Sequence, residues 1–107
     1  MRILPMPPAV VPALGARALW RVEGHSIAIF NVLGTLYAID DSCPHAGASL
    51  SNGKLDGRTV QCPAHGLRFD LLTGCMHSSR TLGVRCYVIE MRGDQPHLVM
   101  PETEAAR

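Results

Sequence analysis

Residues 17–40 read RALWRVEGHSIAIFNVLGTLYAID, and this stretch decides the class of fold. It contains three short runs rich in Ile, Val, Phe and Tyr, separated by Glu23-Gly24 and Leu33-Gly34. β-branched and aromatic residues favour strands, and glycine tolerates the positive φ that tight hairpin turns require. The stretch therefore predicts an antiparallel meander of three strands.

The rest of the chain predicts strands as well. Apolar segments alternate with turn signals: RTVQC, LRFDLLTG, VRCYVIEM and HLVM are separated by Asn-Gly, Asp-Gly, Thr-Gly and RGDQP. No window of a dozen residues has the 3.6-residue periodicity of a helix. We expect an all-β, antiparallel fold.

Composition excludes several classes of function. With 107 residues, 47% of them hydrophobic and 18% charged, the chain fits one ordinary globular domain, spanning residues 1–107. A net charge of +1 without any Lys- or Arg-rich run argues against nucleic-acid binding.

The N-terminal stretch MRILPMPPAVVPALG is apolar, but four prolines interrupt it, and no run of about 20 apolar residues occurs. We expect neither a signal peptide nor a membrane span. Four cysteines without a secretory signal favour a reducing compartment, so we expect a cytoplasmic protein whose cysteines are thiols or metal ligands.

Two short motifs, SCPHAG and QCPAHG, carry the chemistry. Cys43 and His45 are two residues apart, and Cys62 and His65 are three apart. Two thiolates and two imidazoles form a metal-ligand set. Sharp turns are needed to bring each pair to one centre, and these are favoured by Pro44, Gly47, Pro63 and Gly66.

These residues resemble the Rieske [2Fe–2S] signature, and the resemblance covers nearly the whole chain. It implies an antiparallel β-sandwich of small sheets with two cluster-binding hairpin loops at one end, at about 43–48 and 62–67. It also implies one [2Fe–2S] cluster. Cys43 and Cys62 would bind the inner iron, and His45 and His65 the outer, redox-active iron.

The chain departs from the branch of the family found in respiratory quinol-oxidising complexes. That branch has a disulfide clamping the two loops, where this chain has Ala48 and Ala64. It also has hydroxyls that bond to cluster sulfurs, where this chain has Leu67 and Phe69. Fewer donors should lower the potential, so we predict a value below about 0 mV within a family range of roughly −150 to +300 mV.

The resemblance implies a one-electron carrier that is not itself an enzyme. Its partners would be a flavin-dependent NAD(P)H reductase and a terminal oxygenase, such as a ring-hydroxylating dioxygenase of aromatic hydrocarbon catabolism. We expect a monomer without membrane or nucleic-acid partners. The docking surface would be the cluster tip, formed by His45, Ala46, Gly47, Ala64, His65 and Gly66.

Three other interpretations remain open. The first is the small Rieske-like subunit of an assimilatory nitrite reductase. The second is a structural zinc module, because the same donors suit tetrahedral zinc. The third is an accidental set of buried thiols and solvated histidines.

Cys75 and Cys86 lie outside both motifs, and we interpret them as packed thiols, the alternative being a redox-active pair or a spare ligand. His25 lies in a predicted turn, and His77 and His97 lie in polar neighbourhoods, so we expect all three to be solvated.

The remaining aromatic and charged residues near these motifs have structural roles in this interpretation. Trp20, Tyr37 and Tyr87 are expected in the core or half-buried on strands. Asp70 is expected to bond to backbone amides, and Arg68 is expected to be exposed.

Overall fold

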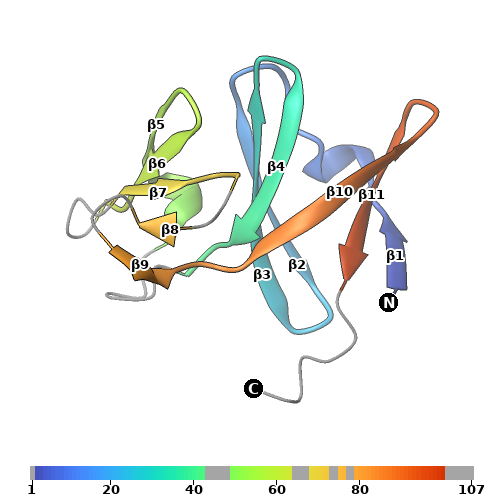
Figure 1. Ribbon diagram of the computed structural model, residues 1–107. Helices are drawn as coiled ribbons and strands as arrows, with labels where there is room; N and C mark the ends of the chain where they lie inside the picture. The colour runs from blue at the N-terminus through green and yellow to red at the C-terminus, as the bar shows by residue number, and fades with distance from the viewer. Residues whose placement is uncertain (1, 43–48, 64–67, 73–74, 77–78, 101–107) are drawn as a thin grey trace.

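The computed structural model describes residues 2–42, 49–63, 68–72, 75–76 and 79–100. Two antiparallel sheets make up the fold (Figure 1). The larger sheet has the order β1-β11-β10-β4-β3-β2 and the smaller has the order β5-β6-β7-β8-β9. The predicted all-β antiparallel fold is confirmed.

The strands of the large sheet are β1 (Arg2–Pro5), β2 (Arg17–Val22), β3 (His25–Val32), β4 (Thr35–Asp40), β10 (Cys86–Arg92) and β11 (Gln95–Met100). Those of the small sheet are β5 (Lys54–Asp56), β6 (Thr59–Gln61), β7 (Arg68–Asp70), β8 (Cys75–Met76) and β9 (Ser79–Gly83). Two 3₁₀ turns, η1 (Pro8–Val10) and η2 (Leu50–Asn52), complete the described elements. No helix among the described residues is long and apolar enough to cross a membrane.

The meander predicted from residues 17–40 is formed by β2, β3 and β4. Both of its turns are two residues long and have positive φ throughout, at 51° and 82° for Glu23-Gly24 and 53° and 93° for Leu33-Gly34. This geometry matches the right-handed twist of the flanking strands. In the second turn the side-chain Oδ1 of Asn31 accepts a hydrogen bond of 2.9 Å from the amide of Gly34.

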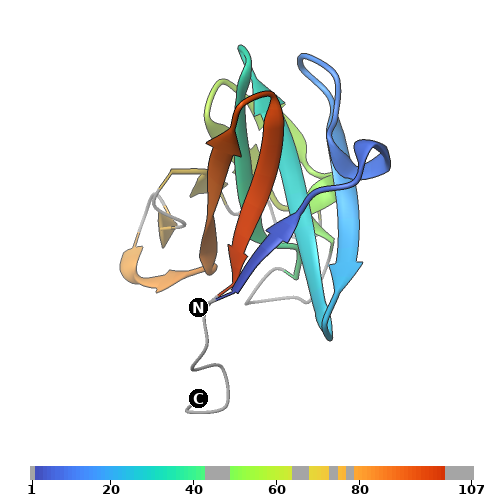
Figure 2. The same cartoon turned by 90° about the vertical axis from the view of Figure 1, so that its right-hand side faces the viewer.

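The N-terminal strand is not predicted by the sequence analysis, which uses the prolines of this stretch only to argue against a signal peptide. β1 pairs with β11 from Arg2↔Met100 to Pro5↔His97, and Figure 2 shows it alongside β11 at the border of the sheet. Proline is tolerated there because an edge strand need not donate every amide to a neighbour. The short strands β5, β8 and β9 were also missed.

The prediction for His25 is wrong. His25 begins β3 and is partly buried, with its Nδ1 3.3 Å from the hydroxyl of Tyr87. The error at His25 arises because a polar residue after a turn can start a strand. His97 lies in β11, in the predicted strand HLVM, and its Nδ1 makes an exposed contact of 3.1 Å with the carbonyl of Gln95. His77 lies outside the described residues.

β3 is buried on both faces and separates two apolar cores. Ala28 and Phe30 face the core shared with the small sheet, whereas Ile27 and Ile29 face the second core. The first core also contains Leu50, Val60, Cys62, Phe69 and Leu71, together with Ile39. The second contains Met6, Val10, Ala38, Tyr87, Leu98 and Met100. Trp20 and Tyr37 pack against these cores, as predicted for half-buried strand residues.

Candidate metal centre

The first ligand loop is closed at its base by a short antiparallel bridge. Ser42 pairs with Ser49, so the chain returns to its starting point across residues 43–48. Cys43 and His45 are within that segment and lie outside the described residues. The structure therefore fixes where this loop begins and ends.

The second ligand loop connects β6 and β7, which pair antiparallel up to Gln61↔Arg68. Cys62 follows β6 directly, and only 1% of its surface is exposed because it packs in the first core with Val60 and Phe69. His65 lies outside the described residues. A cysteine buried where a loop begins suits a ligand on the protein side of a metal centre.

The bases of the two loops lie together. Leu50, which follows the first loop, and Cys62, which starts the second, belong to the same buried cluster. A Cβ on Gly53 would overlap the carbonyl oxygen of Gln61, so the backbone after the first loop is packed directly against the end of β6. The fold therefore starts both predicted ligand pairs from neighbouring points, which fits one shared centre.

Of the four predicted ligands the structure describes only Cys62, and within the described residues no group of three or more His, Cys, Asp or Glu side chains comes together. The donor chemistry, two thiolates and two imidazoles, fits a mixed-ligand iron–sulfur cluster. Such a cluster accepts and releases one electron. The individual ligand roles remain a prediction.

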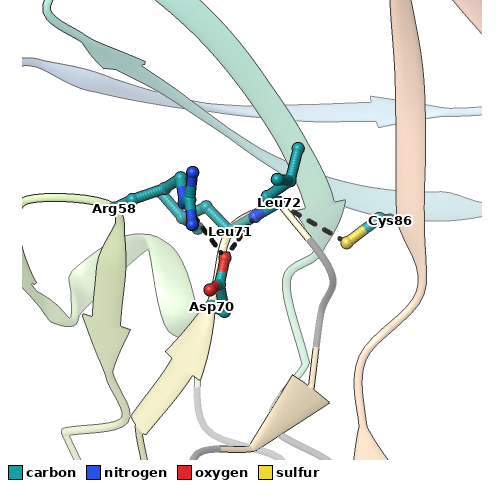
Figure 3. Close-up of polar contacts among 5 residues, drawn as sticks. All are labelled: Arg58, Asp70, Leu71, Leu72 and Cys86. Carbon is teal, nitrogen blue, oxygen red and sulfur yellow. Dashed lines mark hydrogen bonds and ion pairs between the residues drawn. The ribbon is translucent and has the colours of Figure 1, made fainter.

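A group of contacts anchors the strand that leaves the second loop (Figure 3). The carboxylate of Asp70 accepts a 2.8 Å hydrogen bond from the amide of Leu72, which confirms the predicted backbone contact. The same oxygen is 3.3 Å from Nε of Arg58. This ion pair is partly exposed, so its contribution to stability is small. Arg68 is exposed, as predicted.

Cys86 connects this strand to the large sheet. Its thiol donates a hydrogen bond of 3.6 Å to the carbonyl of Leu71, and the residue packs against the first core (Figure 3). The prediction that Cys86 is a packed thiol is confirmed. The side chain of Cys75, in β8, is not described.

The sequence did not reveal the role of Asp41. This residue is only 6% exposed and is the one charged side chain that is buried within the described part of the chain. Its carboxylate accepts hydrogen bonds of 2.6 Å from Oγ of Ser49 and 2.8 Å from the amide of Ser51. Nothing in the sequence distinguishes Asp41 from its neighbour Asp40. The partners of Asp41 lie eight and ten residues later, after the first ligand loop, and only the fold places them next to its carboxylate.

Asp40 contacts a different group, on the large sheet. The hydroxyl of Tyr87 donates a 2.6 Å hydrogen bond to Oδ1 of Asp40 and lies near His25. Burial, and then the bond to Asp40 and its charge, raise the pKa of Tyr87 well above its usual value. Tyr87 is therefore a neutral donor at physiological pH.

Comparison with known proteins identifies the domain family. A family model described as the Rieske [2Fe–2S] domain matches residues 8–88. The ferredoxin component of the naphthalene 1,2-dioxygenase system of Pseudomonas aeruginosa is 37% identical over 75 residues, 69% of this chain and 72% of that protein. The ferredoxin subunit of 3-phenylpropionate/cinnamic acid dioxygenase from Escherichia coli O139:H28 is 38% identical, covering 96% of this chain and 97% of that one.

A solved structure is similar as well. The ferredoxin of carbazole 1,9a-dioxygenase from Nocardioides aromaticivorans IC177 has a TM-score of 0.77 at 27% identity, covering 89% of this chain and 96% of that one. A second solved structure is described as a complex of reduced oxygenase and oxidized ferredoxin in carbazole 1,9a-dioxygenase. One chain of it matches with a TM-score of 0.77 at 32% identity, and the match covers 90% of this chain and 91% of that one.

The fold and these similarities define a small iron–sulfur electron-transfer protein. This chain belongs to the Rieske [2Fe–2S] domain family. It carries electrons and does not itself catalyse substrate turnover. The family assignment favours an iron–sulfur centre over the structural zinc interpretation.

Proposed function

We propose that this protein is the ferredoxin component of an aromatic-ring-hydroxylating dioxygenase system. It carries one electron at a time from a flavin-dependent NAD(P)H reductase to a terminal oxygenase. The observation that carries the proposal is similarity over nearly the full length of both chains to a dioxygenase ferredoxin subunit. We take residues 1–107 as a single Rieske domain that works as a cytoplasmic monomer.

One cluster is held, in this proposal, by Cys43 and Cys62 on the inner iron and by His45 and His65 on the outer iron. The burial of Cys62 supports its place on the inner side. The contact between the loop bases supports a single centre, because the segment that follows the first loop packs against the end of the strand that leads to Cys62. Imidazole in place of thiolate leaves the cluster less negative and so easier to reduce.

The cluster has a low potential for its family, below about 0 mV. The side chain at position 69 supports this, because Phe69 is fully buried in the core with Cys62 and offers no hydroxyl donor. A low potential suits the transfer of electrons from a reduced flavin to an oxygenase better than the oxidation of a quinol.

The oxygenase docks on the loop tip, formed by residues 45–47 and 64–66, where the histidine-bound iron is nearest to a partner. A net charge of +1 provides little long-range steering, so short-lived complexes governed by local fit are expected.

The small subunit of a nitrite reductase is a weaker alternative. A protein assigned as such a subunit has a TM-score of 0.77 to this chain, but at 18% identity that likeness shows the fold alone. Co-purification with a large sirohaem subunit would favour this alternative.

Reconstitution tests the proposal. The purified protein should be brown, contain about two iron and two sulfide per chain, and show the electron paramagnetic resonance (EPR) signal of a mixed-ligand cluster when reduced. With NADH, a flavin reductase of a dioxygenase system and its oxygenase, it should support product formation from an aromatic substrate. A colourless protein with stoichiometric zinc would overturn the proposal, as would a loaded protein that the reductase cannot reduce.

A further inference from the structure

The two ligand loops of this chain lack the clamping disulfide of the respiratory branch, because Ala48 and Ala64 stand where that branch has its extra cysteines. Loops that hold a metal cluster must nevertheless resist opening, since opening exposes the ligands to water and releases the metal. Another set of contacts must therefore restrain the loops, and the described residues at the base of the first loop supply one.

The carboxylate of Asp41 spans the base of that loop. It lies immediately before the Ser42↔Ser49 bridge and bonds to two groups that follow the loop, Oγ of Ser49 and the amide of Ser51. A backbone hydrogen bond also joins the two sides of the loop base: the amide of Leu50 donates to the carbonyl of Asp41 at 2.6 Å. We refer to Asp41, Ser49 and Ser51 as the Asp41 network.

The carboxylate of the network is buried, and the two serine hydroxyls contact each other. Asp41 is buried, and Oγ of Ser49 is 2.8 Å from Oγ of Ser51, so the two hydroxyls and the carboxylate form a continuous chain. Hydrogen bonds to a charged acceptor are stronger than neutral ones and cost more to break when the acceptor is buried. Opening the first loop at Ser49 would break the shortest of these bonds.

The segment that carries these serines is attached to both sheets. Nη1 of Arg17, on β2, donates to the carbonyl of Ser51 at 3.2 Å and also to the carbonyl of Gly53. On the other side, Gly53 packs against the carbonyl of Gln61, the residue before Cys62. The Asp41 network thus restrains the first loop against a segment that itself touches the base of the second.

We propose that the Asp41 network replaces an inter-loop disulfide as the device that keeps the first cluster-binding loop closed and sets the geometry of its ligands. Asp41, Ser49 and Ser51 are positioning residues, which act through the loop and do not themselves bind iron. The proposal rests on the proposed function, in which Cys43 and His45 are cluster ligands.

A matched pair of variants at one position tests the proposal. Ser49→Val removes the hydroxyl, and Ser49→Thr keeps it in a side chain of nearly the same shape; both β-branched residues suit the extended backbone there. Leu98→Val is the control, because it weakens the second core, to which neither loop contributes a described residue. Three quantities are measured on the loaded protein: the rate of iron release to a chelator, the EPR spectrum of the reduced cluster, and the reduction potential.

We expect Ser49→Val to release iron at least about tenfold faster than the wild type, because one hydrogen bond to a charged group is lost. Its EPR spectrum and potential should shift, and Ser49→Thr should behave as the wild type. Leu98→Val should change neither spectrum nor potential. If Ser49→Val matches Ser49→Thr, or if Leu98→Val releases iron equally fast, the proposed role of the network is wrong.

The outcomes separate this inference from the proposed function. If the wild type holds its cluster and relays electrons while Ser49→Val behaves as the wild type, the inference alone fails. If the loaded wild type does not relay electrons but Ser49→Val loses its cluster faster, the function alone fails. A wild type that binds no [2Fe–2S] cluster would overturn both.

Discussion

Replacing Gly53 by alanine should loosen the contact between the two loop bases. Gly53 has φ −77° and ψ 167°, an ordinary extended conformation, so alanine introduces no backbone strain. Its Cβ, however, would overlap the carbonyl oxygen of Gln61 and lie 3.0 Å from Cγ2 of Val60 and 3.1 Å from the carbonyl oxygen of Leu50. Two of these three contacts are backbone oxygens, which cannot rotate away, so η2 must move off β6.

The size of the effect follows from two opposing terms. Overpacking of this kind costs about 1–3 kcal/mol. Alanine also restricts the unfolded chain, which offsets about 0.4–1 kcal/mol. With central values of about 2 and about 0.7 kcal/mol, the free energy of unfolding should fall by about 1.3 kcal/mol, and at about 4–8 °C per kcal/mol the melting temperature should fall by about 5–10 °C.

Gly93→Ala provides the control for this prediction. A Cβ at Gly93 meets nothing within 4 Å, but φ there is +64°, so alanine is strained by about 1–2 kcal/mol at a site in the β10–β11 turn. Both variants should lose comparable stability in a thermal melt, whereas only Gly53→Ala should release iron to a chelator faster than the wild type. Wild-type stability in Gly53→Ala, or equal iron release from both variants, would refute the argument that Gly53 joins the loop bases.

Three further predictions concern the cluster and the core. Phe69→Tyr adds a hydroxyl donor and should raise the reduction potential by ~60 mV in voltammetry, the equivalent of about 1.4 kcal/mol favouring the reduced cluster; an unchanged potential would show that residue 69 does not reach the cluster sulfurs. His65→Ala should lose or alter the EPR signal while Cys86→Ser and Cys75→Ser keep it, and bleaching of either serine variant would make the ligand assignment wrong. Because burial and the bond to Asp40 raise the pKa of Tyr87 in the folded state, the stabilising effect of its neutral hydroxyl is fully present below pH ~10 and is lost as pH rises further. Urea unfolding at pH 9 and 11 should therefore show a smaller fall in stability for Tyr87→Phe than for the wild type, and equal falls would contradict this linkage.

Local signals were sufficient for a large part of the fold. The meander of β2, β3 and β4 was predictable because its turns are marked by glycine and its strands by alternating β-branched residues, both of which act within a few residues. β1 was not predictable from local signals. A proline-containing segment becomes a strand only when a distant partner, here β11, supplies the hydrogen bonds. His25 was misplaced for a related reason, since its environment is set by Tyr87 across the sheet.

The sequence by itself determined the chemistry of this protein. The donor types and their spacing at Cys43, His45, Cys62 and His65 indicated a Rieske-type centre, and Ala48, Ala64, Leu67 and Phe69 indicated a missing clamp and missing hydroxyls. Only the tertiary structure decided what holds the loops in place. Asp41 and Ser49 are eight residues apart, and Gly53 and Gln61 are also eight apart, so neither contact follows from a local pattern. Such contacts form only when the two sheets have packed around a shared core. Burial then strengthens the hydrogen bonds, and strand pairing brings the partner residues within contact distance.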